Sequence, residues 1–431
     1  MASGYIDDFA AFISASPSSY HAAAEVARQL VAAGFAAVDE TEPWPVPEPG
    51  VPQRGVIVRD GAVVAWAAPA DVEPGTPFRI VGAHTDSPGF KLKPRPTTGA
   101  AGWLQAGVEV YGGPLLNSWL DRELELAGRV VTSDGTEHLV RSGPLLRIPQ
   151  LAVHLDRGVN NEGLVLDKQR NTQPVWGVGE AQVEDLLAEV VAVGGVLASE
   201  IAGFDLVTAD TQPPRVFGLD GSLLAAGRLD NLSSVYAGLL ALLETAGNDG
   251  GPAPGHISVL VAFDHEELGS ESRSGASGPI LDDVLSRIAG ATGADGDALR
   301  RAYAASWCVS ADAGHAVHPN YQEKHDAVNR PIAGGGPLLK INANQRYATD
   351  AHGAALWARL CGAAGVPYQE FVSNNSVPCG TTIGPLTATR LGIRTVDVGV
   401  PLLSMHSARE LCHVDDPRWL SAALGQFFAG A

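Results

Sequence analysis

Short apolar runs that end in charged or imidazole side chains recur along this chain, and they constrain its fold most. Residues 78–83, 256–263 and 305–311 are apolar enough to be buried strands, and each leads directly into a histidine or a carboxylate. Helical patterns separate such runs, as at 232–245 and 350–364. This alternation predicts an α/β fold with a mostly parallel central sheet that is flanked by helices. The same periodicity predicts a helical segment at 6–33, a helix at 281–288, a proline-rich loop at 42–52, and strands at 54–59, 62–67, 338–341 and 395–400.

The pattern changes in the middle of the chain. Short alternating stretches such as 103–111 and 124–133 are punctuated by glycine and proline, and one helical stretch stands out at 183–193. A chain of 431 residues is long enough for two domains. We therefore predict a β-rich domain at 91–214, inserted into a catalytic domain made of 1–90 and 215–431.

Charge and cysteine usage restrict the partners and the compartment. The formal net charge is −19, which repels nucleic acid and anionic membranes and requires a local cationic group for any acidic substrate. The four cysteines lie far apart, without a CxxC pair, as expected for free thiols in a reducing compartment. The first residues do not read as a signal peptide, and no apolar run approaches the ~20 residues that span a bilayer. We expect a cytoplasmic protein.

Two of the polar clusters contain residue pairs suited to metal chemistry. His84 and Asp86 are two apart in an extended segment, so they face the same side, and a carboxylate commonly orients a metal-bound imidazole. Glu266 and Glu267 are adjacent, which permits one to bind metal while the other serves as a general base. Each cluster alone also fits a hydrogen-bonded turn or a solvated loop.

The other clusters are single carboxylates or histidines near strand ends. Asp230 begins an apolar helix and can be a plain N-cap, but its two oxygens could also bridge two metals. Asp312 ends a strand and is followed by His315 and His318, and His406 follows the strand at 395–400. Because ligand sites in open α/β sheets gather beyond the carboxyl ends of the strands, a shared metal site explains these positions better than unrelated coincidences do.

At this point the chain resembles the aspartyl aminopeptidases, which are dinuclear zinc aminopeptidases with a zinc-exopeptidase-like fold. The resemblance covers residues 82 to 410 in the family's order. Its motifs are GAHTDSPG, LAVHLDR, ADTQPP, RLDNL, FDHEELGS, SADAGHAVHPNY, LLKINANQRYATD, PCGTTIGP and MHSARE. The segment 411–416, which includes His413, matches no pattern that we can assign.

The resemblance implies a role for each matching residue. One metal would be held by His84, Asp230 and Asp312, and the other by Asp230, Glu267 and His406. Glu266 would be the general base, Asp86 the carboxylate behind His84, and His154 a histidine that reaches a neighbouring subunit's active site. Lys340, His315 and Tyr347 would line the substrate pocket. The insert would be a dimerisation domain in a homo-oligomer, typically a tetrahedral dodecamer.

The expected reaction is release of N-terminal residues, preferably Asp or Glu, from peptides. The ligand types suit zinc, and Co²⁺ or Mn²⁺ can also occupy such sites. Three alternatives stay open on the sequence alone: a neutral or hydrophobic N-terminal preference, a related two-metal deacylase or carboxypeptidase, and a catalytically inactive scaffold.

Overall fold

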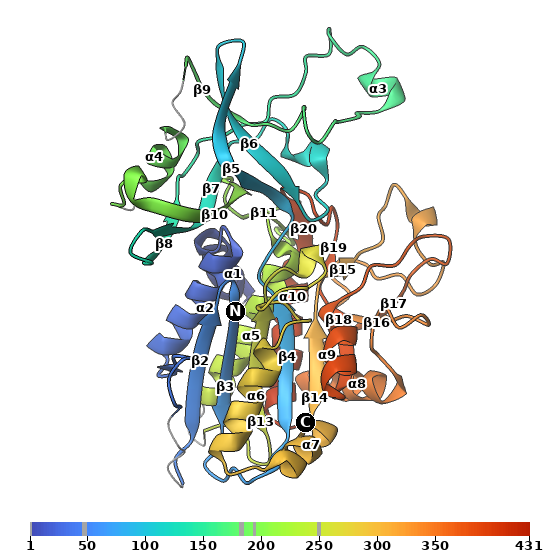
Figure 1. Cartoon of the computed structure of the whole chain (residues 1–431). Coiled ribbons are helices and arrows are strands. Elements are labelled where there is room, and N and C mark those ends of the chain that lie inside the picture. The colour runs from blue at the N-terminus through green and yellow to red at the C-terminus, as the bar shows by residue number, and fades with distance from the viewer. Residues whose placement is uncertain (1, 45–49, 181–184, 193–194, 248–250) are drawn as a thin grey trace.

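Two large β-sheets, one above the other in Figure 1, form the framework of the computed structural model, which describes residues 2–44, 50–180, 185–192, 195–247 and 251–431. The lower sheet has nine strands. In spatial order they are β1 (Ala36–Ala37), β2 (Gln53–Arg59), β3 (Ala62–Ala68), β13 (Ile257–Phe263), β4 (Phe78–His84), β14 (Trp307–Ala311), β18 (Arg394–Gly399), β16 (Leu338–Ile341) and β17 (Gln369–Val372). The central strands β13, β4, β14 and β18 run parallel to one another. The predicted α/β fold with a mostly parallel sheet is confirmed.

Helices cover both faces of this sheet because successive strand residues point to opposite sides. In β3, Val63 and Ala65 belong to one apolar core, whereas Val64 and Trp66 belong to another. The first core is closed by α1 (Ala2–Ala15), α2 (Ser19–Ala32), α5 (Leu229–Gly247), α8 (Ala351–Ala364) and α10 (Asp415–Phe428). The second is closed by α6 (Ile280–Ala291), α7 (Gly296–Ala305) and α9 (Ile383–Leu391).

The N-terminal helical segment differs from the prediction. It is broken into α1 and α2 at Pro17, and the side chain of Ser18 accepts a hydrogen bond from the backbone of His21 as the N-cap of α2. Proline lacks a backbone N–H and disfavours a helical residue before it, so a break at this point is expected once the position is considered.

The upper sheet is antiparallel throughout and has its own apolar core. Its strands, in spatial order, are β8 (Glu137–Arg141), β7 (Leu124–Thr132), β10 (Ile201–Asp210), β5 (Gly89–Ala100), β6 (Trp103–Tyr111) and β9 (Val175–Val178). These strands come from residues 89–210, which agrees with a β-rich insertion; the domain limits at 91 and 214 stay a prediction. The helix expected at 183–193 is α4 (Asp185–Val191), and residues 183, 184 and 193 lie outside the described residues.

Several smaller elements complete the fold. They are α3 (Val159–Glu162), the three-stranded sheet β11 (Arg215–Phe217), β12 (Leu223–Ala226) and β20 (Glu410–His413), and the pair β15 (Gly314–His315) and β19 (Pro401–Leu402). Within the described part of the chain, no helix is long and apolar enough to cross a membrane.

Candidate metal centre

The predicted metal ligands converge beyond the carboxyl ends of the parallel strands. They come from the end of β4, the start of α5, the short helix after β13, the residue after β14, and the loop between β19 and β20. In that order they are His84, Asp230, Glu267, Asp312 and His406. The sheet therefore brings together residues that are up to 322 positions apart in the sequence.

His84 lies at the middle of a group of carboxylates. Its Nε2 atom is 3.3 Å from Asp230 Oδ1 and 3.4 Å from Asp312 Oδ1, and 3.9 Å from Glu266 Oε2. The side chain is only 1% exposed. Its other ring nitrogen, Nδ1, is 3.1 Å from the carbonyl oxygen of Asp86. Because a carbonyl oxygen can only accept, Nδ1 carries the proton, and the lone pair of Nε2 faces the carboxylates.

His406 approaches the same group from the opposite side of Asp230. Its Nε2 atom is 3.5 Å from Asp230 Oδ2 and 3.3 Å from Glu267 Oε2. Its Nδ1 atom is 3.0 Å from the carbonyl oxygen of Gly113, so here too Nε2 is the free nitrogen. The two oxygens of Asp230 thus each face one histidine, as expected for a carboxylate that bridges two cations.

A second layer of residues fixes this arrangement. Asp86 accepts hydrogen bonds from the backbone N–H groups of Glu266 and Glu267, at 3.0 and 3.2 Å, and from the hydroxyl of Tyr111 at 2.9 Å. Glu410 is 2% exposed. It accepts from the backbone N–H of Asp230 at 2.9 Å and of His406 at 2.7 Å.

Tyr111 and Glu410 were not among the residues predicted from the sequence. Neither bears an unusual local pattern, although Glu410 ends the MHSARE motif. Only the folded chain shows that they contact the backbone or the side chains of the metal-site residues.

The site chemistry requires a cation. Asp230 Oδ1 and Glu267 Oε1 are buried without a hydrogen-bond partner among the described residues. Burial raises the pKa of Glu266 to about 8, and the charges of Asp312 and Asp230 add to this shift. Burial and the charge of Asp230 likewise raise the pKa of Glu267 well above its usual range. Divalent cations relieve such repulsion, and carboxylates with free imidazole nitrogens are ligands that suit zinc.

The residues assigned to substrate binding lie around a separate cavity of about 210 Å³. His315 and Tyr347 line it, together with Lys324, His325 and Phe371. Among its described lining residues there is no Asp or Glu. Burial lowers the pKa of His315 and of His325, so Lys324 supplies the positive charge among the described lining residues, and no carboxylate offsets it.

Lys340 lies behind the wall of this cavity. Its Nζ donates a hydrogen bond to the carbonyl of Ala313 at 2.7 Å, and it is 3.7 Å from Asp312 Oδ2 and 5.3 Å from the ring centre of Tyr347. The side chain is buried. The ammonium charge is therefore one aromatic ring away from the cavity and beside a metal-site carboxylate.

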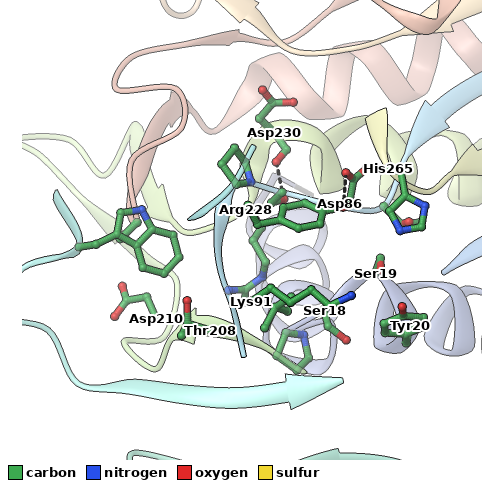
Figure 2. Close-up of a pocket in the computed structure, with 18 of the residues that line it drawn as sticks. Ser18, Ser19, Tyr20, Asp86, Lys91, Thr208, Asp210, Arg228, Asp230 and His265 are labelled. Atoms are coloured by element: carbon green, nitrogen blue, oxygen red, sulfur yellow. Dashed lines mark hydrogen bonds between the residues drawn. The ribbon is translucent and has the colours of Figure 1, made fainter. Parts of the chain in front are cut away.

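The face of the metal centre toward the upper sheet is polar. Figure 2 shows a pocket there, with Asp86 and Asp230 on the same wall as Arg228, near the N-terminus of α2. Its volume of about 50 Å³ holds a few water molecules and excludes a peptide.

The histidines at 154, 318 and 413 lie outside the metal centre. His154 is exposed, in a loop before α3 that projects away from the lower sheet (Figure 1). The Nδ1 of His318 accepts a hydrogen bond from the backbone of Asn320, and the Nδ1 of His413 accepts one from Asp415, so both stabilise turns.

Known proteins are similar to this chain in sequence and in fold. Residues 12–428 match the family described as "Aminopeptidase I zinc metalloprotease (M18)". A probable M18 family aminopeptidase 2 of Streptomyces avermitilis is 54% identical over 429 residues, covering 99% of this chain and 98% of the relative. A homologue of the same name in Mycobacterium leprae is 46% identical, covering 98% of each chain.

Solved structures of similar proteins have the same fold as this chain. A chain in the cryo-EM structure of the Ape4 and Nbr1 complex superposes with a TM-score of 0.94 at 35% identity, covering 99% of this chain and 86% of that one. The S. cerevisiae mApe1 dodecamer gives a TM-score of 0.86 at 28% identity, covering 98% of this chain and 96% of that one.

Proposed function

This chain belongs to the M18 family of zinc aminopeptidases, and we propose that it releases N-terminal residues, preferably Asp and Glu, at a centre of two zinc ions. The observation that carries the proposal is the position of Asp230, whose two oxygens face the free nitrogens of His84 and His406. We assign His84, Asp230 and Asp312 to one zinc. We assign Asp230, Glu267 and His406 to the other.

The residues around the zinc ions divide the work of hydrolysis. When bound, zinc polarises the scissile carbonyl and lowers the pKa of water. Glu266 is 3.9 Å from His84 Nε2 and has no ligand role in this assignment, so its carboxylate is free to take the proton from water and return it to the leaving amine. The hydrogen bond from its backbone N–H to Asp86 holds Glu266 at the edge of the centre.

The acidic preference follows from the charge of the substrate cavity. Lys324 lines it without a compensating carboxylate among the described residues, and Lys340 adds its charge from behind Tyr347. His315 and His325, whose pKa values are lowered by burial, offer neutral hydrogen-bonding groups. A carboxylate side chain of the substrate would be drawn to this region despite the negative net charge of the protein.

We further propose that the chain forms a homo-oligomer, as the mApe1 dodecamer does, in which His154 completes a neighbouring subunit's site. The loop that carries His154 exposes Leu151, Val153 and Leu155, which are 59%, 49% and 75% exposed. Apolar side chains gathered on a projecting loop are typical of contact surfaces between subunits. The four free cysteines, three of them buried, are consistent with a cytoplasmic location.

The direct test is hydrolysis of Asp-, Glu-, Leu- and N-acetyl-Asp-p-nitroanilide by zinc-loaded protein. Release from Asp and Glu in preference to Leu is expected. Release from Leu alone would retain the aminopeptidase and reject the acidic preference, whereas release only from the acetylated substrate would show a deacylase.

The role of Glu266 is tested by Glu266→Gln. This variant should keep its zinc content and lose activity by two or more orders of magnitude, since general base catalysis contributes about 10²–10⁴-fold. The exposed Glu271, changed to Gln, is the matched control and should behave as wild type. Full activity of Glu266→Gln would refute the assignment.

A further inference from the structure

A segment of the upper sheet reaches the metal centre. Strand β6 ends at Tyr111, which pairs with Gly89, the first residue of β5. Because β5 begins five residues after His84, the two strands of this hairpin meet the centre at the same place. The residues that follow Tyr111, up to Ser118, then pass along the loop that carries His406.

Tyr111 contacts the carboxylate that orients His84. Its hydroxyl donates to Asp86 Oδ2 at 2.9 Å, while Asp86 Oδ1 is 3.4 Å from His84 Nδ1. Asp86 is 3% exposed, so water can supply few hydrogen bonds to its carboxylate in place of the one from Tyr111. Burial and the nearby charge of Asp86 raise the pKa of Tyr111, which keeps its hydroxyl protonated as a donor.

The next residues of the segment hold His406. The carbonyl of Gly113 accepts the hydrogen bond from His406 Nδ1, and the backbone N–H of Leu115 donates to the carbonyl of His406 at 2.9 Å. The backbone N–H of Ala408 donates to Ser118 Oγ at 2.9 Å. Two hydrogen bonds therefore fix the side chain and the backbone of His406, which faces Asp230 and Glu267, and a third fixes Ala408 in the same loop.

Gly112 allows this close approach. It adopts φ +66°, and a Cβ atom at this position would lie 3.2 Å from Glu267 Cβ and 3.3 Å from the Glu267 carbonyl oxygen. Both the left-handed backbone and the lack of space favour glycine. The segment 111–113 thus touches Asp86, Glu267 and His406 with three consecutive residues.

We propose that Tyr111 is a positioning residue for the metal centre, and that the segment 111–118 makes the zinc affinity of the lower sheet depend on the upper sheet. The proposal rests on the zinc ligands assigned under the proposed function. Tyr111 acts through Asp86 on His84, and the residues after it act on His406. Groups that contact a metal ligand directly, as Asp86 contacts His84, typically change metal affinity by about 10–100-fold when they are removed, and Tyr111, one contact further out, should act at the lower end of that range.

The test is the Tyr111→Phe variant, which removes one oxygen atom and keeps the ring. Zinc affinity is measured by competition with a chromophoric chelator, and the absorption spectrum of the cobalt-loaded protein reports the ligand geometry. We expect one zinc to bind about 10-fold more weakly and the cobalt spectrum to change. Gly112→Ala, which displaces Glu267, should weaken zinc binding independently.

Tyr303→Phe is the matched control. The Tyr303 hydroxyl also donates to a carboxylate, Asp282 Oδ1 at 2.7 Å, and its ring is buried in the core on the other face of the sheet. This variant should bind zinc as wild type does. If Tyr111→Phe bound both zinc ions with wild-type affinity and gave an unchanged cobalt spectrum, the positioning role would be wrong. If the wild-type protein bound no zinc, the proposed function itself would fail.

Discussion

Replacing Lys340 by Met separates two roles that the structure gives to one ammonium group. Met has a similar length but no charge and no donor, so the change removes the hydrogen bond to Ala313 and the charge beside Asp312 and Tyr347. The first loss affects the metal-site backbone and is felt by every substrate. The second removes positive charge from behind the substrate cavity and is felt mainly by acidic substrates.

The two effects differ in size. Leaving the carbonyl of Ala313 unpaired costs the folded state about 1–3 kcal/mol, and this cost does not depend on the charge of the substrate. A substrate carboxylate beyond the Tyr347 ring, at about 8 Å from Nζ, would interact with it by about 2 kcal/mol at an effective dielectric constant of about 20. Screening by water in the cavity reduces this to about 1–2 kcal/mol, so the ratio of kcat/KM for Asp over Leu substrates should fall about 5–30-fold.

The assay compares kcat/KM for Asp- and Leu-p-nitroanilide in wild type and in Lys340→Met at equal zinc content. Lys91→Met is the control, because Lys91 is also paired with a carboxylate, Asp205 at 2.7 Å, but does not line the substrate cavity. Its ratio should not change. An equal loss on both substrates in Lys340→Met would refute the assignment of Lys340 to substrate selection and leave it a support for Asp312.

Three further predictions concern stability and assembly. Burial lowers the pKa of His256, whose Nε2 donates to the Phe428 carbonyl, to about 4. The unfolded chain binds a proton at this histidine more readily than the folded chain does, so the free energy of unfolding present above pH ~6.5 is lost as the pH falls toward 4. Urea unfolding of the chelated protein measures this loss. Between pH 7.5 and 4.5, the free energy of unfolding of His256→Gln should fall by about 2–3 kcal/mol less than that of wild type. Glu410→Ala should leave two backbone N–H groups unpaired, at about 1–3 kcal/mol each, and lower the thermal midpoint of the zinc-loaded protein. Finally, the His154→Ala and Glu266→Gln variants should each lose activity. Co-expression of the two variants should restore part of the activity, because a mixed oligomer contains sites with both residues intact. If no activity returned, His154 would lie outside the active site.

The fold class was predictable because buried parallel strands have long apolar runs that local periodicity reveals. The strands at 78–83 and 62–67 differ from β4 and β3 by one residue at their ends. The break in the N-terminal helix was missed because apolar spacing continues across Pro17. The proline indicates a break near this position, and the Ser18 cap shows that α2 begins at Ser19.

The metal cluster was predictable for a different reason. Strands that run parallel end at the same edge, so residues such as His84 and Asp312 that follow separate strands must lie near each other. The residues that hydrogen-bond to this cluster, Tyr111 and Glu410, do not follow a strand of the parallel sheet, so the sequence pattern did not single them out. Tyr111 meets Asp86 through the pairing of β6 with β5, in which Tyr111 lies opposite Gly89, and Glu410 meets Asp230 through the pairing of β20 with β12. Contacts made through tertiary packing cannot be read from local sequence pattern.

The contacts of Tyr111 and Gly113 connect the inserted sheet to the metal centre of the lower sheet. Every assigned zinc ligand lies outside residues 91–214, which suggests that the catalytic part is complete in itself. The hydrogen bonds at the centre contradict this, since Tyr111 and Gly113 of the insert fix Asp86 and the ring of His406. A chain without the insert would retain the ligands but lose two of the groups that orient them. Because zinc binding depends on preorganised ligands, we expect deletion of the insert to weaken zinc binding even though every assigned ligand remains.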